Sequence, residues 1–179
     1  MKLLKEFTIP FIGLKLGKHH FEYQISKAFF EHFEYEDFND SSVNVAVVLN
    51  KKTTFLELDF KISGSVNINC DVTNEAFDQE ITSHFNLVVN FGDEFSDDEI
   101  DIVILPHGEY EINIQQYVYE FIVLSVPQKK VHPGVEDGSL NSEILKKLEE
   151  LSPKLKEYKE TEEETDPRWN TLKKLLTDK

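Results

Sequence analysis

The 179-residue sequence is poor in cysteine and glycine, and each shortage excludes a class of protein. Cys70 is the only cysteine, so the chain has neither a disulfide framework nor a cysteine-built zinc site. Its seven glycines form no dinucleotide-binding or phosphate-cradling motif. No apolar run reaches the roughly 18 residues of a membrane helix, and Glu6 and Thr8 interrupt the stretch that a secretion signal needs. We therefore expect a cytoplasmic protein without membrane contact, metal or cofactor.

Basic residues are missing from a long central stretch. Between Lys61 and Lys129, 67 residues contain 13 Asp and Glu but no Lys or Arg, which accounts for −13 of the formal net charge of −15. This charge argues against bulk capture of nucleic acid, which requires a basic footprint, and against docking on anionic lipid. Two interpretations stay open: a solvated surface that keeps the protein soluble, or a face complementary to a basic protein partner.

Alternation of apolar and polar residues dominates the first 105 positions. It runs through 43–49, 56–62, 66–70, 85–91 and 102–104. Such alternation is typical of strands with one buried and one wet face, as in antiparallel sheets. We predict an α+β fold in which an antiparallel, curved sheet or partial β-barrel is covered by helices.

A helical period predicts the covering elements. Residues 25–33 place three core phenylalanines at helical spacing, and 114–125 form an amphipathic helix that ends before Pro127. A third helix opens near 141–142 and is kinked or restarted at Pro153.

The end of the chain predicts a separate helix. Six acidic residues make 157–166 an acidic linker, after which Asp166 caps a helix and Pro167 occupies its first position. The predicted organisation is one α+β domain over 1–156, the linker over 157–166 and a C-terminal helix over 167–178.

No enzyme motif is present, but one acidic cluster suggests an alternative. The cluster comprises Asp93, Glu94, Asp97, Asp98, Glu99 and Asp101. A calcium loop of the EF-hand kind that starts at Asp93 would have Asp98 at its glycine position and Ile104 at its final ligand, so that motif fails. We interpret the cluster as a solvated turn between strands. The alternative is a divalent-metal-dependent RNA-processing enzyme that uses the acids of residues 93–101.

The closing helix carries the only tryptophan and the only arginine, Trp169 and Arg168. The helix either docks on the domain, because short helices are marginal alone, or anchors a partner, since Trp and Arg are enriched among interface hot spots. The candidate partner-binding residues are Asp166, Pro167, Arg168, Trp169, Lys173, Asp97, Asp98 and Glu99. The oligomeric state is left open. Cys70 falls at a buried position of its strand, which predicts a packed, inert thiol.

Three stretches of the sequence form a pattern when taken together: 68–73, then the segments 111–114, 124–127 and 131–133, and finally the Asp-Pro-Arg-Trp block that opens 166–175. In this order they resemble the YceD family of large ribosomal RNA subunit accumulation proteins, in a form typical of Bacteroidetes. The resemblance implies a non-enzymatic cytosolic role in ribosomal RNA accumulation or ribosome assembly. Combined with the charge, it predicts a basic ribosomal protein or an assembly intermediate as the direct partner and leaves RNA contact open.

The resemblance has one departure. Many members of that family carry a Cys-x-x-Cys pair at the first stretch and a second cysteine pair after the His-Pro loop, a possible zinc arrangement. Here Thr73 stands at the partner position of Cys70, and 138–141 contain no cysteine. We therefore expect any metal site of the family to be lost in this chain.

Overall fold

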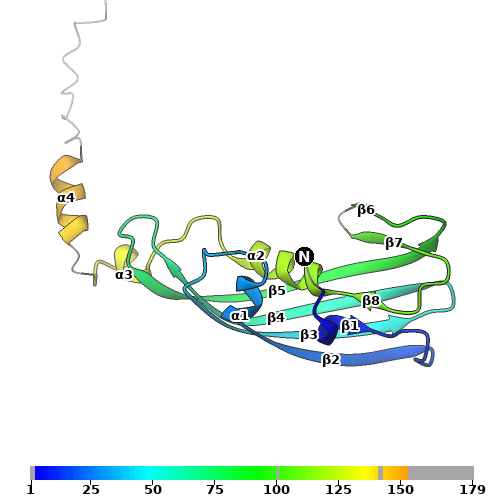
Figure 1. Cartoon of the computed structure of the whole chain (residues 1–179). Coiled ribbons are helices and arrows are strands. Elements are labelled where there is room, and N and C mark those ends of the chain that lie inside the picture. Colours follow the sequence, from blue (N-terminus) through cyan, green and yellow to red (C-terminus); the bar gives the residue numbers. More distant parts are fainter. Residues whose placement is uncertain (1–2, 100, 141–142, 153–179) are drawn as a thin grey trace, which may run out of the picture. The chain divides into compact units, whose positions relative to one another are not determined.

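The computed structural model describes residues 3–99, 101–140 and 143–152 (Figure 1). It comprises two units, Met1–Ser142 and Glu143–Lys179, which are described separately. The first unit contains η1 (Lys5–Phe7), β1 (Thr8–Ile9), β2 (Gly17–Ser26), α1 (Lys27–Glu31), β3 (Asp40–Lys51), β4 (Phe55–Asn69), β5 (Ala76–Gly92), β6 (Ser96–Glu99), β7 (Ile102–Pro106), β8 (Ile112–Asn113), α2 (Gln115–Ser125) and α3 (Pro133–Glu136). The predicted linker and C-terminal helix, 157–178, lie outside the described residues, and the predicted domain boundaries stay predictions.

The mixture of helices and strands confirms the predicted combination of the two. Six strands form one sheet in the order β2-β3-β4-β5-β7-β6, which is open and has β2 and β6 as its edges. A second, two-stranded sheet joins β1 to β8. The alternating segments predicted as strands lie in β3, β4, β5 and β7, and the runs before and after Gly64 belong to the single strand β4.

One pair of strands departs from the predicted antiparallel arrangement. Four neighbouring pairs of the large sheet are antiparallel, but β5 and β7 are parallel. After β5 the chain reverses to form the edge strand β6, and it reverses again to place β7 between β6 and β5. The prediction is wrong at this pair because alternation reports which face a residue occupies and carries no information on strand direction.

The core lies between one face of the large sheet and the helices α1 and α2 (Figure 1). Phe121 of α2 stacks on Phe85 of β5, with ring centroids 4.5 Å apart and planes 5° apart, and meets the edge of Phe60 of β4 at 5.0 Å. Aromatic pairs in these geometries contribute about 0.5–1.5 kcal/mol beyond the area that they bury. They therefore fix where α2 crosses the sheet.

The predicted helix over 25–33 is shorter in the structure, because β2 continues to Ser26 and α1 covers Lys27–Glu31. The expected core role of its phenylalanines is confirmed for Phe29 and Phe30, which are buried. Phe33 lies beyond the helix and stacks on Tyr119 of α2 at 4.2 Å. This stacking packs the segment that follows α1 against α2.

The second unit contributes α4 (Glu143–Leu151), which agrees with the helix predicted to open near 141–142. Its apolar residues Ile144, Leu148 and Leu151 recur at helical spacing, and none of its residues is buried. Within the described residues, no helix is both long and apolar enough to cross a membrane.

Gly64 gives a direct test of the central sheet. Its φ is +149°, and a Cβ at this position would collide with the Ser42 carbonyl oxygen and the Val43 Cα of the neighbouring strand. Because backbone atoms cannot move aside, we expect Gly64→Ala to lower the free energy of unfolding by about 2–4 kcal/mol. Urea denaturation measures the loss. Gly13→Ala is the control, since nothing lies within 4 Å of its Cβ position, and equal effects of the two substitutions would contradict the explanation.

Candidate functional site

The structure describes part of the predicted partner-binding set. Asp97 is exposed on β6, and the backbones of Asp98 and Glu99 complete the same strand. The other five residues, Asp166, Pro167, Arg168, Trp169 and Lys173, lie outside the described residues. The expectation of a turn is wrong for 96–99, because pairing of this segment with β7 overrides the low strand propensity of aspartate and glutamate. The strand puts Asp97 at the edge of the sheet.

Asp97 acts electrostatically on Tyr117 of α2. Burial of the Tyr117 ring, followed by the negative charges of Asp97 and Glu120, raises the pKa of its hydroxyl from 10.0 to about 12. Two carboxylates therefore act on one phenol at the junction of β6 and α2. The edge strand and the helix thus belong to one acidic surface.

In the part of the chain that the structure describes, the acidic side chains of the central stretch form no ion pair with a basic residue. The ion pairs among the described residues are Lys52–Glu57, His84–Asp59 and Lys130–Asp37, and none of them uses an acidic residue from 62–128. Some of these carboxylates accept hydrogen bonds from neutral groups: Asp78 accepts from the Asn67 side chain and Glu120 from Gln116. Such bonds leave the negative charge in place, so the surface keeps its field.

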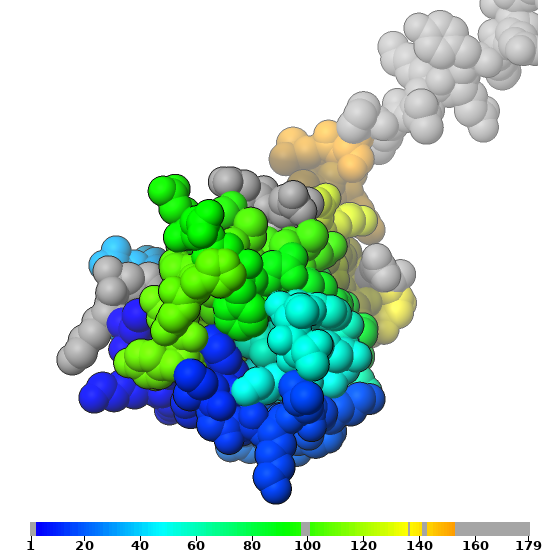
Figure 2. Space-filling model, turned by 90° about the vertical axis from the view of Figure 1, so that its right-hand side faces the viewer, coloured from blue at the N-terminus to red at the C-terminus, as the bar shows by residue number. Residues whose placement is uncertain are grey.

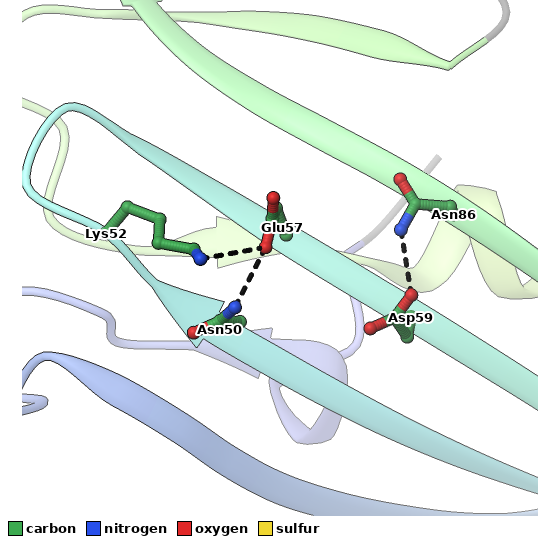
Figure 3. A network of polar contacts seen from close by, with 5 residues as sticks. All are labelled: Asn50, Lys52, Glu57, Asp59 and Asn86. Atoms are coloured by element: carbon green, nitrogen blue, oxygen red, sulfur yellow. Dashed lines mark hydrogen bonds and ion pairs between the residues drawn. The ribbon is translucent and has the colours of Figure 1, made fainter.

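On the sheet face opposite the helices, two carboxylates, those of Glu57 and Asp59, contact neighbouring polar or basic side chains (Figure 3). Glu57 accepts a hydrogen bond from Asn50 at 2.8 Å and pairs with Lys52 at 3.5 Å. Asp59 accepts a 2.8 Å hydrogen bond from Asn86 of the next strand and lies 3.8 Å from the His84 ring. These cross-strand contacts occupy both carboxylates locally, which leaves them less available to a partner.

A pocket beside α1 adds acidic residues that the sequence reasoning missed. Its volume is about 420 Å³, and its lining consists of Lys27, Glu31, Glu34, Tyr35, Glu36, Phe38 and Asn39. Three glutamates face one lysine there. The signal was present in the sequence, since 31–37 contains four acidic residues among aromatic ones.

Residues 70–71 and 130–132, which are about 60 residues apart in sequence, meet where β4 ends and β5 begins. The Asp71 N–H donates to the Lys130 carbonyl at 2.7 Å, and the Lys130 N–H donates to an Asp71 carboxylate oxygen at 2.8 Å. The His132 N–H donates to the Cys70 sulfur at 3.3 Å. We call this arrangement of Cys70, Asp71, Lys130 and His132 the clasp.

The clasp gives Cys70 a more specific environment than the sequence predicted. The thiol is buried, as expected. Burial acts to raise its pKa, but hydrogen bonds from the His132 backbone and from Thr73 outweigh this effect and lower the pKa of Cys70. The His132 ring accepts a hydrogen bond from the Gly134 N–H through Nδ1 at 2.9 Å, so this nitrogen caps α3.

Comparison with protein families identifies the chain. The family model for the large ribosomal RNA subunit accumulation protein YceD matches residues 58–176. The chain belongs to the YceD family. No curated protein and no solved structure matches it. The match begins inside β4, so it includes the clasp and the whole stretch without basic residues.

The structure describes Thr73, one of the positions at which the family resemblance predicted the loss of a cysteine. Thr73 contributes to the hydrogen bonding of the Cys70 sulfur, where a second cysteine would stand. Among the described residues, no group of three or more His, Cys, Asp or Glu side chains is placed to hold a metal ion. Hydrogen bonds connect the two segments of the clasp in this member of the family.

Titration of Tyr117 tests the acidic junction. We expect its phenol to ionise near pH 12, and Asp97→Asn to lower this pKa towards 10.0 because one negative charge is removed. Absorbance at 295 nm, with Tyr117→Phe as the reference, measures the change. Because the pKa of Tyr117 is higher in the folded chain than in the unfolded chain, the unfolded chain loses the phenolic proton at lower pH. The contribution of Tyr117 to the free energy of unfolding is therefore fully present below pH 10 and is lost between pH 10 and about 12. A Tyr117 pKa that Asp97→Asn leaves unchanged would contradict the assigned proximity.

A chelator tests whether a metal supports the clasp. We expect protein purified without added metal to contain no stoichiometric zinc, and EDTA to leave its melting temperature unchanged. In contrast, Cys70→Ala leaves the His132 N–H without its acceptor and should lower the free energy of unfolding by about 1–3 kcal/mol. Elemental analysis and calorimetry measure the two effects. A zinc content near one per chain would refute the prediction.

Proposed function

We propose that this YceD protein supports the accumulation of large-subunit ribosomal RNA as a non-enzymatic factor that binds a basic ribosomal protein or an assembly intermediate. The family supports the connection to large-subunit RNA. The mode of action is inferred from charge. We expect the protein to act in the cytoplasm, where ribosomes are assembled.

One observation supports the binding mechanism: those acidic side chains of 62–128 that the structure describes form no ion pair with another described residue. Unpaired surface charge of one sign speeds the encounter with a partner of opposite sign and rejects partners of like sign. Ribosomal RNA is itself an anion, so its bulk capture would work against this field. A basic protein fits the surface better.

Two sets of residues are proposed to meet the partner. Asp97, Asp98 and Glu99 would steer its approach from the edge strand. Arg168 and Trp169 would provide a specific contact, since arginine offers a planar group for carboxylate or phosphate and tryptophan a large apolar anchor. Asp166, Pro167 and Lys173 would set the start and the charge of the segment that carries them.

Reversal of the edge-strand charges tests the proposal. Combined Asp97→Lys, Asp98→Lys and Glu99→Lys substitutions should slow association with isolated large-subunit precursors at about 50 mM salt and have little effect at about 300 mM. Trp169→Ala should weaken binding by about 2 kcal/mol without a comparable loss of thermal stability. Surface plasmon resonance gives the rates and affinities.

The control carries the same charge change elsewhere, as Glu6→Lys, Glu22→Lys and Glu149→Lys at exposed positions outside the stretch. It should associate faster than the edge-strand variant. Association of the edge-strand variant at the wild-type rate in low salt would leave the acidic stretch with solubility as its role.

A further inference from the structure

Four loops meet at one end of the large sheet. The register pairs Gly17 with Lys51, Phe55 with Asn90, and Gly92 with Pro106, so the adjoining loops 10–16, 52–54, 93–95 and 107–111 share this end. We call it the loop end. Figure 2 views the molecule from this side, and the segments coloured blue, cyan, green and yellow-green form one continuous face.

The loop end carries large apolar side chains that are mostly exposed. Their exposed fractions are 68% for Ile12, 63% for Leu16, 55% for Phe95 and 54% for Tyr110. A single exposed apolar residue needs no explanation, but several gathered on one face and bordered by polar groups mark an interaction site. Their grouping on neighbouring loops distinguishes them from scattered exposed residues.

Hydrogen bonds hold loop 10–16 in place and join it to loop 107–111. The Lys51 ammonium donates to the carbonyls of Phe11, Ile12 and Leu14 at 2.8, 3.3 and 2.9 Å. The Ile12 N–H donates to the Tyr110 carbonyl at 3.2 Å, which connects the two loops. Exposed groups on a pre-organised loop cost less conformational entropy when they bind.

Charge at the loop end selects the partner. Asp93, Glu94 and Glu109 are exposed around Phe95 and Tyr110, and no hydrogen bond or ion pair is formed by their carboxylates within the described part of the chain. Lys51 keeps its positive charge but directs it to the carbonyls of loop 10–16, and Lys52 pairs with Glu57, so neither lysine forms a described ion pair with Asp93, Glu94 or Glu109.

The other lysines at this end lie beside a different strand. Lys18 is in β2, and the carbonyl of Lys15 accepts a 2.8 Å hydrogen bond from the His19 side chain of β2. Because β2 is three strands from β5, ordinary strand spacing separates the backbone of Lys18 from β5 by about 14 Å, beyond the screening length of about 10 Å at 0.1 M salt. Lys15 belongs to the same loop as Phe11, whose ring centroid lies 5.6 Å from that of Phe91 in β5. The exposed charged residues that flank Phe95 and Tyr110 in sequence, Asp93, Glu94 and Glu109, are all acidic.

We propose that the loop end is a docking surface for a lysine- or arginine-rich protein segment that also carries a large apolar side chain. Ile12, Phe95 and Tyr110 receive the apolar group, while Asp93, Glu94 and Glu109 pair with its cations. This surface deepens the proposed function and rests on it, because it specifies where the basic partner binds. The surface adds Ile12, Phe95, Glu109 and Tyr110, which the sequence reasoning did not select.

The test uses the full chain and two kinds of probe: large-subunit ribosomal proteins, each purified free of RNA, and 23S ribosomal RNA stripped of protein. Ile12→Ser, Phe95→Ser and Tyr110→Ser are combined in one variant that changes no charge. We expect at least about a tenfold loss of affinity for the basic protein that binds the wild type. Leu124→Ser is the matched control, since Leu124 is 69% exposed on α2, and it should bind like the wild type.

A second variant removes the charges through Asp93→Asn, Glu94→Gln and Glu109→Gln. It should reduce the association rate severalfold at about 50 mM salt and have little effect at about 300 mM. Thermal melting shows whether each variant is folded. Since the two variants remove different chemistry, a folding defect in one leaves the other as a test.

The outcomes separate the surface from the proposed function. If the wild type binds a basic ribosomal protein and both loop-end variants bind it equally well, the loop-end proposal is wrong and the proposed function stands. If the wild type binds stripped RNA alone, both proposals fail. If it binds neither probe, the loop-end proposal fails, and the measurement on isolated large-subunit precursors decides the proposed function. Light scattering tests whether a second copy of this chain occupies the surface. If the wild type is a dimer and the apolar variant is a monomer, the surface belongs to the dimer interface and the proposal is overturned.

Discussion

The packing of Phe121 against Phe60 and Phe85 is the contact on which the rest of the first unit depends. It places α2 over the middle of the two longest strands, β4 and β5. Because α2 follows β8, the same contact brings β8 back beside β1, where the Ile114 N–H donates to the Phe7 carbonyl at 2.9 Å. The loops next to β1 and β8 thereby reach the end of the sheet together.

The acidic side chains of the sheet face and those of the loop end differ in whether they have partners. Glu57 and Asp59 accept hydrogen bonds from side chains on the neighbouring strands. These bonds help to stabilise the sheet. Asp93, Glu94 and Glu109 have no such partners within the described residues, so their mutual repulsion costs some stability. Such charges are typical of a surface that is completed by another molecule.

The sequence predicted the features that depend on local periodicity and missed those set by chain direction and turn geometry. Alternation located β3, β4 and β5, and a helical period located α2, since burial of one face imposes both patterns. The parallel β5–β7 pair has no signature in the residues. The end of α1 was also hidden, because Glu34 adopts a positive φ of 56° where glycine is the usual residue. Of the candidate site, the acidic stretch was visible from composition, whereas the loop end required knowing which strand ends meet.

The clasp and the loop end lie at opposite ends of β4, which has 15 residues and so spans about 50 Å. The clasp is made of backbone N–H and carbonyl groups, the Asp71 carboxylate and one buried sulfur, and directed hydrogen bonds join its two segments. The loop end displays apolar rings and free carboxylates on fixed loops. Groups that are fully bonded stabilise a fold, while exposed groups on a rigid support retain their binding energy for a partner. The long strand therefore separates the hydrogen-bonded clasp from the proposed docking surface.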